Sequence, residues 1–478
     1  MFNIKIKDNN YSGFKLTNQT VSNFTQITDS EKTKVIEALK TISNVPPAKL
    51  AKDGFIVFPR SNAAESDLAN QDKIISVQDL ESDNPTIKTG NIMGFFTVNN
   101  TVQIEIHSRF DDSGKQYFLH HMLSKVCNVA PTKELIEATS KNPLHNFAVY
   151  LFPAFLKRAL EQGMFRTYVT REYNDSNIRG PIDFPRHLRN NIPFNGKIAY
   201  RTREFSSNNP LTHLIRHTIE FIDENHNMHS ILAGNARTDV AEIRACTENY
   251  RRSERSIIIA KNSRPITSPF YSEYENLRKL CLMILNREKH SYTSNDTQIN
   301  GILFDGASLW EDYLATLLAP KGFLHPKNRE RSGGIRMFDN SNKDKASEDP
   351  ELTFDNFDKN HRKIYPDFYK PNKDDDSQDG FILDAKYKHL QNGVGREDLF
   401  QVVTYMHTMN IKNGGFIYPA DSLTDSNSKL WTLAGLGGTI HVCGMKIPTN
   451  KEKFDDFCKD MEAQEKQLLE AIQERISP

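Results

Sequence analysis

Apolar and polar positions change period several times in the first 145 residues. Residues 30–41 place apolar side chains three and four positions apart behind a polar start, which predicts a helix. Residues 54–58 and 93–107 are rich in β-branched and aromatic side chains, and the second segment ends in strict alternation, so both predict strands. Helical spacing returns over residues 118–126. We therefore expect residues 1–145 to form a mixed α and β domain that binds a partner or DNA.

The region 146–295 has mainly helical spacing, with a basic interruption. Residues 155–204 contain ten Lys or Arg against five Asp or Glu. Aromatic residues are interleaved with them: Phe165, Tyr168, Tyr173, Phe184 and Tyr200. Basic residues mixed with aromatic residues suit a surface that follows phosphates. The alternative, which the sequence leaves open, is a solvated face beside ordinary core aromatics. The region is expected to be a mainly helical middle domain.

The region 296–478 begins after a polar stretch at 289–297 that is typical of a linker. Its pattern predicts a helix at 304–318, then a long loop, a strand, an acidic loop, a strand, a helix, two strands and a charged final helix at 451–476. Alternating helices and strands over such a length predict an α/β domain.

Composition excludes several classes of protein. The 478 residues are too many for one ordinary core. The 61 basic and 61 acidic residues balance, so the chain is no polycation that coats DNA through its global field. Five cysteines without a C-x-x-C pair disfavour a disulfide framework and a zinc site. The N-terminus lacks an apolar signal core, and no apolar run approaches the ~20 residues that span a bilayer, so we expect a cytoplasmic protein without a membrane role.

The candidate chemistry lies in residues 381–388. Strand alternation there places Phe381, Leu383, Ala385 and Tyr387 on one face, and Ile382, Asp384, Lys386 and Lys388 on the other. A carboxylate and an ammonium group are thus side by side above an apolar face. A second acid, Asp367, lies upstream in the strand-like segment 365–368.

Two converging carboxylates can hold Mg²⁺, which prefers oxygen ligands, and a lysine beside them can stabilise charge that develops on phosphate. An acid followed by acid-x-lysine is a weak pattern by itself. Its surroundings strengthen it. A predicted helix at 396–407 places Gln401 and Tyr405 four residues apart on one face, and the helix at 304–318 offers Glu311 as a further ligand.

In this order, the helical Glu311, the Pro-Asp at 366–367, the Asp-Ala-Lys at 384–386 and the Gln-x-x-x-Tyr at 401–405 resemble the PD-(D/E)xK nuclease superfamily, in particular its RecB-like branch. Over residues 90–420 the chain resembles the McrC family, the nuclease subunits of McrBC-type restriction systems, LlaJI-like systems included. Three upstream segments agree with that family: Gln103-Ile-Glu-Ile-His-Ser-Arg-Phe110, Asn177-Ile-Arg-Gly-Pro-Ile-Asp183 and Glu204-Phe-Ser-Ser-Asn-Asn-Pro-Leu211.

The resemblance implies an α/β fold class (α+β overall), in which 296–478 form a restriction-endonuclease-like domain with a mixed central sheet flanked by helices. It also implies that Asp367 and Asp384, with Glu311, bind Mg²⁺ and that Lys386 is the catalytic lysine. Gln401 and Tyr405 would support them.

The sequence contains no Walker A motif, so no nucleotide site of that kind is expected in this chain. The resemblance implies that GTP is bound by a separate McrB-like AAA+ GTPase, which this chain stimulates while cutting double-stranded DNA. The sequence leaves open homodimerisation through the complex, in which two copies would meet to cut both strands. The basic segment 155–204 is a candidate contact with the motor or with DNA. Two alternatives stay open: a non-catalytic activator of the motor, and a stand-alone repair or defence nuclease.

Two loops complete the sequence-based expectations. The acidic loop 370–380 would repel phosphate, so we expect it to point away from DNA as a solvated tip. The loop 327–349 begins with basic residues that suit a DNA contact, and a flexible insertion explains them equally well.

Overall fold

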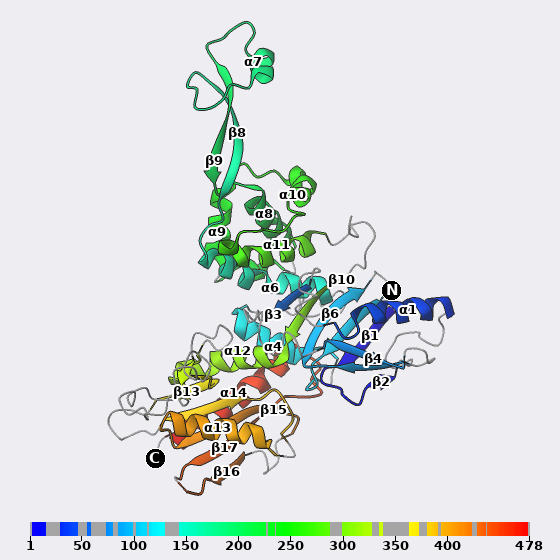
Figure 1. Ribbon diagram of the computed structural model, residues 1–478, viewed down its shortest axis with the longest axis vertical. Coiled ribbons are helices and arrows are strands. Elements are labelled where there is room, and N and C mark those ends of the chain that lie inside the picture. Colours follow the sequence, from blue (N-terminus) through cyan, green and yellow to red (C-terminus); the bar gives the residue numbers. More distant parts are fainter. Residues whose placement is uncertain are drawn as a thin grey trace, which may run out of the picture. The chain divides into compact units, whose positions relative to one another are not determined.

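The computed structural model describes most of the chain. The described residues are 2–15, 29–45, 55–58, 73–79, 85–98, 102–111, 114–129, 143–225, 228–234, 236–286, 299–326, 334–337, 363–371, 380–390, 393–422, 428–435 and 437–476. The chain folds as two compact units, Met1–Asn128 with Asn295–Pro478, and Val129–Ser294. Each unit is described separately below (Figure 1).

The first unit contains a five-stranded sheet built from four N-terminal strands and one strand from the region 296–478. Its order is β1 (Phe2–Lys7), β7 (Val102–His107), β6 (Ile92–Val98), β10 (Ile299–Asp305) and β3 (Phe55–Phe58). β1 is parallel to β7 and β3 is parallel to β10, whereas β6 is antiparallel to both of its neighbours. Because β10 lies in the region 296–478, this sheet joins the N-terminal segment to the residues that precede the predicted site.

A smaller sheet and a helix close the core on one side of that sheet. β2 (Phe14–Lys15), β5 (Thr86–Thr89) and β4 (Ile75–Gln78) form the small sheet, and α1 (Asp29–Ile42) packs with it. Val102, Ile104 and Ile106 of β7 are fully buried in this core, because every second side chain of a strand points to the same face. Burial of these apolar groups is the main favourable contribution to folding here.

Three helices pack around one buried acid in the first unit. Glu465 of α14 (Phe454–Ile476) accepts hydrogen bonds from His121 Nε2 of α4 (Tyr117–Cys127) at 2.7 Å and from the Tyr313 hydroxyl of α12 (Gly306–Leu318) at 2.6 Å. Burial opposes ionisation of Glu465, but these hydrogen bonds outweigh it and lower its pKa. The buried carboxylate is therefore paired, as it must be to avoid a large desolvation cost.

The C-terminal sheet has the order β13 (Phe368–Lys370), β14 (Phe381–Ala385), β15 (Asn413–Ala420), β17 (Thr439–Lys446) and β16 (Ser428–Thr432). The central strands β14, β15 and β17 are parallel, and the outer strands β13 and β16 are antiparallel to their neighbours.

Helices cover both faces of this sheet (Figure 1). Ile440 and Val442 of β17 pack in one core with α13 (Arg396–Thr408). Met445, which alternation places on the opposite face, meets the Tyr313 hydroxyl of α12. The result is a mixed central sheet between helices, as the sequence predicts for this region.

The second unit is a helical base from which a β-ribbon extends (Figure 1). Its helices are α6 (Pro143–Glu161), α8 (Pro210–Asp223), α9 (Ala236–Cys246), α10 (Arg255–Lys261) and α11 (Ser272–Leu285). β8 (Thr167–Asp175) and β9 (Ile198–Ser206) pair with each other along their whole length, and α7 (Phe184–Asn190) lies near the tip of the ribbon. The basic interruption predicted from composition is this ribbon.

The predicted fold class is confirmed: mixed α and β structure with a sheet-and-helix C-terminal region. Several boundaries were wrong. The segment 93–107 forms two strands rather than one, and the helix expected from residue 304 begins at Gly306 because the Asp305 carboxylate caps it. Strands β10 and β16 were not expected.

The strand predicted over 381–388 ends at Ala385. Both of its faces are buried, including Ile382, which was assigned to a polar face. The three-domain division stays a prediction, since the first and last regions pack in one unit and packing does not decide whether they fold separately.

The loops predicted at 327–349 and 370–380 lie almost wholly outside the described residues. Among the described helices, none combines the length and apolar character needed to cross a membrane.

We predict that Gly94→Ala destabilises the first unit by about 3 kcal/mol, measured by denaturant unfolding. Gly94 has φ 155°, and a Cβ there would lie 2.3 Å from the Ile302 carbonyl oxygen of β10. Gly114→Ala is the control, because Gly114 also has a positive φ but a Cβ there would meet no atom within 4 Å. Its cost should stay near the ~1–2 kcal/mol of backbone strain. Equal costs for the two variants would contradict the steric argument.

Candidate functional site

Asp367 lies between β12 (Lys363–Ile364) and β13, at the edge of the C-terminal sheet. Its Oδ2 accepts a hydrogen bond from the Ala385 amide at 2.7 Å, which ties it to the end of β14. Burial, Asp384 and Glu311 together raise the pKa of Asp367 well above its usual range. The side chain is thus an acid held close to two others.

Asp384 is the last residue but one of β14 and is 1% exposed. Its Oδ2 lies 2.6 Å from the Lys386 Nζ. This contact is an ion pair without good hydrogen-bond alignment, since Oδ2 is also a buried oxygen with no well-oriented donor. Burial raises the pKa of Asp384, and the Lys386 ammonium opposes that rise. The oxygen keeps lone-pair capacity for a further cation.

Lys386 follows the end of β14, and its amide donates to the Ile417 carbonyl at 2.9 Å. Its ammonium lies near three acceptors in the described part of the chain: Asp384 at 2.6 Å, Asp398 at 3.3 Å and Gln401 Oε1 at 3.3 Å. Burial lowers its pKa, but the neighbouring carboxylates more than compensate and raise it above its usual range. Lys386 is therefore a fixed positive charge.

Gln401 and Tyr405 extend this contact along α13. The Gln401 Nε2 donates to the Tyr405 hydroxyl at 2.6 Å, and that hydroxyl donates to the Tyr365 carbonyl at 3.2 Å. Burial raises the pKa of Tyr405 to about 12, and Asp384 adds to the rise. The hydroxyl thus stays protonated and links α13 to the segment that carries Asp367.

Glu311 of α12 reaches the site through a histidine. The His325 Nε2 lies 3.6 Å from Glu311 Oε1, and its Nδ1 donates to the Asp367 carbonyl at 2.8 Å. The ring stacks on Phe368, with centroids 4.8 Å apart. His325 therefore fixes the backbone of Asp367 and faces Glu311.

The structure thus brings together all six residues that the sequence analysis selected. They are Glu311, Asp367, Asp384, Lys386, Gln401 and Tyr405. The sequence analysis missed His325 and Asp398. His325 is 42 residues from Asp367, so no spacing pattern links them. Asp398 had a detectable signal, because an acid in the first turn of a helix is favourable, but that signal also has a purely structural explanation.

The donor set fits a hard divalent cation. Mg²⁺ is usually held by one or two protein carboxylates and keeps several waters, so Asp367 and Asp384 suffice. Glu311 lies close enough to Asp367 to help raise its pKa. A cation would also relieve the crowding of buried negative charge that raises both aspartate pKa values. Within the described ranges, no group of three or more His, Cys, Asp or Glu side chains is placed to hold a metal ion. Asp367 and Asp384 are therefore considered as a pair of candidate ligands.

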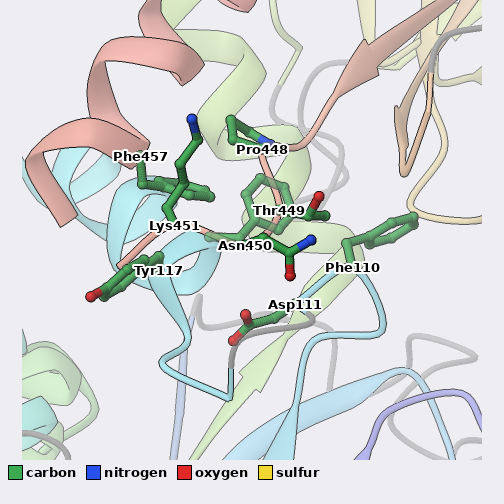
Figure 2. Close-up of a pocket in the computed structure, with 9 residues that line it drawn as sticks. Phe110, Asp111, Tyr117, Pro448, Thr449, Asn450, Lys451 and Phe457 are labelled. Carbon is green, nitrogen blue, oxygen red and sulfur yellow. The ribbon is translucent and has the colours of Figure 1, made fainter. Parts of the chain in front are cut away.

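Two pockets lined by described residues lie elsewhere. Figure 2 shows a pocket in the first unit whose volume, about 10 Å³, has room for roughly one water. It lies between Phe110 and Asp111 after β7 and Asn450 and Phe457 near the start of α14. A larger hollow of about 540 Å³ lies at the base of the β-ribbon in the second unit. None of the six selected residues lines either pocket.

Comparison with solved structures gives two related assemblies from Thermococcus gammatolerans. One is a refined half-complex from a tetradecameric assembly of McrB AAA+ hexamers with bound McrC; it is 14% identical, the match covers 96% of this chain and 99% of that chain, and the TM-score is 0.46. The other is the McrBC complex, 14% identical over 66% of this chain and 87% of that chain, with a TM-score of 0.31. Nothing among the curated proteins matches this chain.

A family model also matches the chain, and its description is specific. The McrBC 5-methylcytosine restriction system component model matches residues 87–419, about 70% of the chain. That range agrees with the span over which the sequence motifs resemble the McrC family, and it confirms the resemblance. The chain belongs to the family of McrBC 5-methylcytosine restriction system components.

Proposed function

We propose that this chain is the Mg²⁺-dependent endonuclease subunit of a GTP-dependent, McrBC-like restriction complex and that it cuts double-stranded DNA. The observation that carries the proposal is the convergence of Asp367, Asp384 and Lys386 at the end of β14. Membership of the McrBC component family supports the assignment to a restriction system. The arrangement of the three residues supports the proposal that the chain cleaves phosphodiester bonds.

Asp367 and Asp384 would hold Mg²⁺, with Glu311 as a third oxygen ligand or as a partner of metal-bound water. A Mg²⁺ ion supplies Lewis-acid polarisation of the phosphate and lowers the pKa of a bound water. Lys386 stays charged and donates to the phosphate oxygen on which negative charge develops. Asp398 and Gln401 keep its ammonium at the carboxylates, so little reorganisation is needed when DNA arrives.

The remaining contacts orient these groups. His325 fixes the Asp367 backbone through its carbonyl, and Tyr405 ties α13 to the preceding Tyr365. A non-catalytic activator would not need a metal-binding acid pair with a charged lysine between two helices. The intact arrangement therefore favours the enzyme over that alternative.

The β-ribbon supports a protein partner. Its tip exposes large apolar side chains: Ile178, Ile182, Phe184, Leu188, Ile192 and Phe194. Such an exposed apolar group marks a protein–protein contact more than a phosphate contact. The basic residues behind it are largely paired within the ribbon, for example Arg186 with Glu172 at 2.7 Å and Arg201 with Asp183 at 2.8 Å.

We therefore assign the ribbon to contact with a McrB-like AAA+ GTPase that binds GTP, rather than to DNA. In the solved T. gammatolerans assembly, McrC is bound to McrB AAA+ hexamers. A partner of the same kind distinguishes this proposal from a stand-alone nuclease. Cutting both DNA strands requires two such sites, so the proposal includes self-association through the complex.

Asp384→Ala and Lys386→Ala should each lower the rate of DNA cleavage at least ~100-fold, because each removes charge that acts on the transition state. The measurement is a plasmid cleavage assay with Mg²⁺, GTP and the McrB-like partner. Lys446→Ala is the matched control, since Lys446 is an exposed lysine of the same sheet outside the site. Cleavage at the wild-type rate by either site variant would refute the assignment.

Mg²⁺ should stabilise the wild-type chain without DNA or partner. At 100 times its Kd, binding adds about 2.7 kcal/mol to the free energy of unfolding, read as a rise in the melting temperature. Asp384→Asn should abolish most of that rise because one of two ligands is lost. A rise of equal size in Asp384→Asn would place the metal elsewhere.

Phe184→Ser and Phe194→Ser should each reduce stimulation of the partner's GTP hydrolysis at least ~5-fold, because truncating a buried aromatic anchor costs more than about 1 kcal/mol of binding. Both rings are more than 60% exposed at the ribbon tip. Phe270→Ser is the control, a 71% exposed phenylalanine of the same unit outside the ribbon. If Phe270→Ser impairs stimulation as much as the tip variants, the ribbon is not the contact.

A further inference from the structure

Tyr387, the residue after Lys386, leaves the C-terminal sheet and enters the end of the N-terminal sheet. It is buried, and its hydroxyl lies 2.7 Å from Ser108 Oγ, just after β7. The hydroxyl also lies 3.5 Å from the Met93 sulfur of β6. The Phe110 ring meets the Tyr387 ring edge-on at 5.2 Å. The side chain next to the lysine is therefore held by strands that come from the first quarter of the sequence.

Arg109 covers the face of that tyrosine ring. Its guanidinium lies 4.9 Å from the Tyr387 ring centroid, within cation–π distance. The guanidinium is itself fixed: Asp8 accepts from Nε and Nη2, at 2.7 Å for the shorter contact, and the Asn91 Oδ1 accepts from Nη2 at 2.8 Å. Both Asp8 and Arg109 are buried, so this planar fork has little freedom to move.

The same tyrosine packs on the start of α12, the helix that carries Glu311. A Cβ at Gly306 would lie 2.6 Å from the Tyr387 ring, so glycine is required for the approach. The Gly306 amide also donates to the Asn91 carbonyl at 3.3 Å. The Tyr387 side chain, directly after Lys386, thus contacts both the start of α12 and the residues that follow β7.

We infer that Arg109 and Tyr387 are positioning residues, through which the N-terminal sheet sets the place of Lys386 and of the start of α12. The inference deepens the proposed function and rests on it for the chemistry of Lys386. It gives a role to Ser108, Arg109 and Phe110, which follow β7 and are buried. Strand alternation accounts for the buried side chains of β7 but not for these three. Arg109 acts on the site through Tyr387 and does not touch the reacting groups.

The variants separate the ring, the hydroxyl and the guanidinium fork. Tyr387→Leu removes the stacked ring, Arg109→Lys keeps the charge for Asp8 but loses the fork and the planar stack, and Tyr387→Phe loses only the hydroxyl. Val102→Ala is the matched control. It opens a cavity in the same sheet at the opposite end of β7, away from Tyr387.

The first readout is amide exchange of the full-length chain, followed in a peptide that spans residues 381–390. The Lys386 amide is protected by its bond to the Ile417 carbonyl. Tyr387→Leu and Arg109→Lys should raise exchange there at least ~10-fold, whereas Val102→Ala should change it less than ~2-fold at an equal or larger loss of global stability. Unchanged exchange in the first two variants, or the same rise in Val102→Ala, overturns the inference.

The second readout is cleavage with Mg²⁺, GTP and the McrB-like partner. Tyr387→Leu and Arg109→Lys should lower kcat ~10-fold or more with KM for DNA within ~3-fold, while Tyr387→Phe, which keeps the ring, should lose less than ~3-fold. If the loss of kcat follows the loss of melting temperature in all variants, Val102→Ala included, the positioning role is refuted.

The two readouts separate the two claims. A wild-type chain that does not cut DNA, but whose exchange responds to Tyr387→Leu and Arg109→Lys as expected, refutes the proposed function and leaves the positioning role standing. A wild-type chain that cuts DNA, without that exchange response, keeps the proposed function and refutes the positioning role.

Discussion

The Lys386 ammonium lies 2.6 Å from a nearly inaccessible carboxylate, and the contacts of the candidate site are arranged around that ion pair. Burying Asp384 beside Asp367 is unfavourable, since desolvation raises both pKa values; repulsion by Asp384 and Glu311 adds to the rise at Asp367, and repulsion by Asp398 adds to the rise at Asp384. Lys386 offsets part of that cost, and Asp398 and Gln401 hold the lysine in place from α13. A buried charge group of this kind contributes little net stability, which is the usual signature of residues retained for chemistry.

That ion pair can be maintained only if several distant segments are held in register. The Asp367 carboxylate accepts a hydrogen bond from the Ala385 amide, and the Lys386 amide donates to the Ile417 carbonyl of the next parallel strand. The Tyr387 hydroxyl contacts Ser108, just after β7 of the N-terminal sheet. Each contact fixes a different side of the same short stretch. The N-terminal sheet is completed by β10, which leads directly into α12, so the segment before the site and the segment after the lysine share one support.

Sequence periodicity predicts contacts that are local in the chain. Alternation predicted the Asp384–Lys386 pairing although β14 ends at Ala385, and helical spacing predicted the Gln401–Tyr405 pairing. Asp367 and Glu311 were selected as acids of a nearby strand-like segment and of a predicted helix, and the order of the family motifs agrees with that selection, although no local rule connects the two residues. His325, the Asp8–Arg109–Tyr387 stack and strand β10 depend on tertiary pairing between remote segments, and the ribbon's half-exposed strands have no apolar face that alternation could reveal.

The ribbon also resolves what the balanced net charge left open. Its basic excess suggested a phosphate-binding surface, yet Arg171, Arg186 and Arg201 each form an ion pair with an acid of the same ribbon. These pairs weaken the local positive field without removing it, because Lys and Arg outnumber Asp and Glu ten to five over residues 155–204. The exposed apolar tip then becomes the dominant feature of the ribbon, and burying it against another protein is favourable. In the proposed complex, a chain whose basic and acidic residues balance would gain DNA affinity from the partner that the ribbon binds.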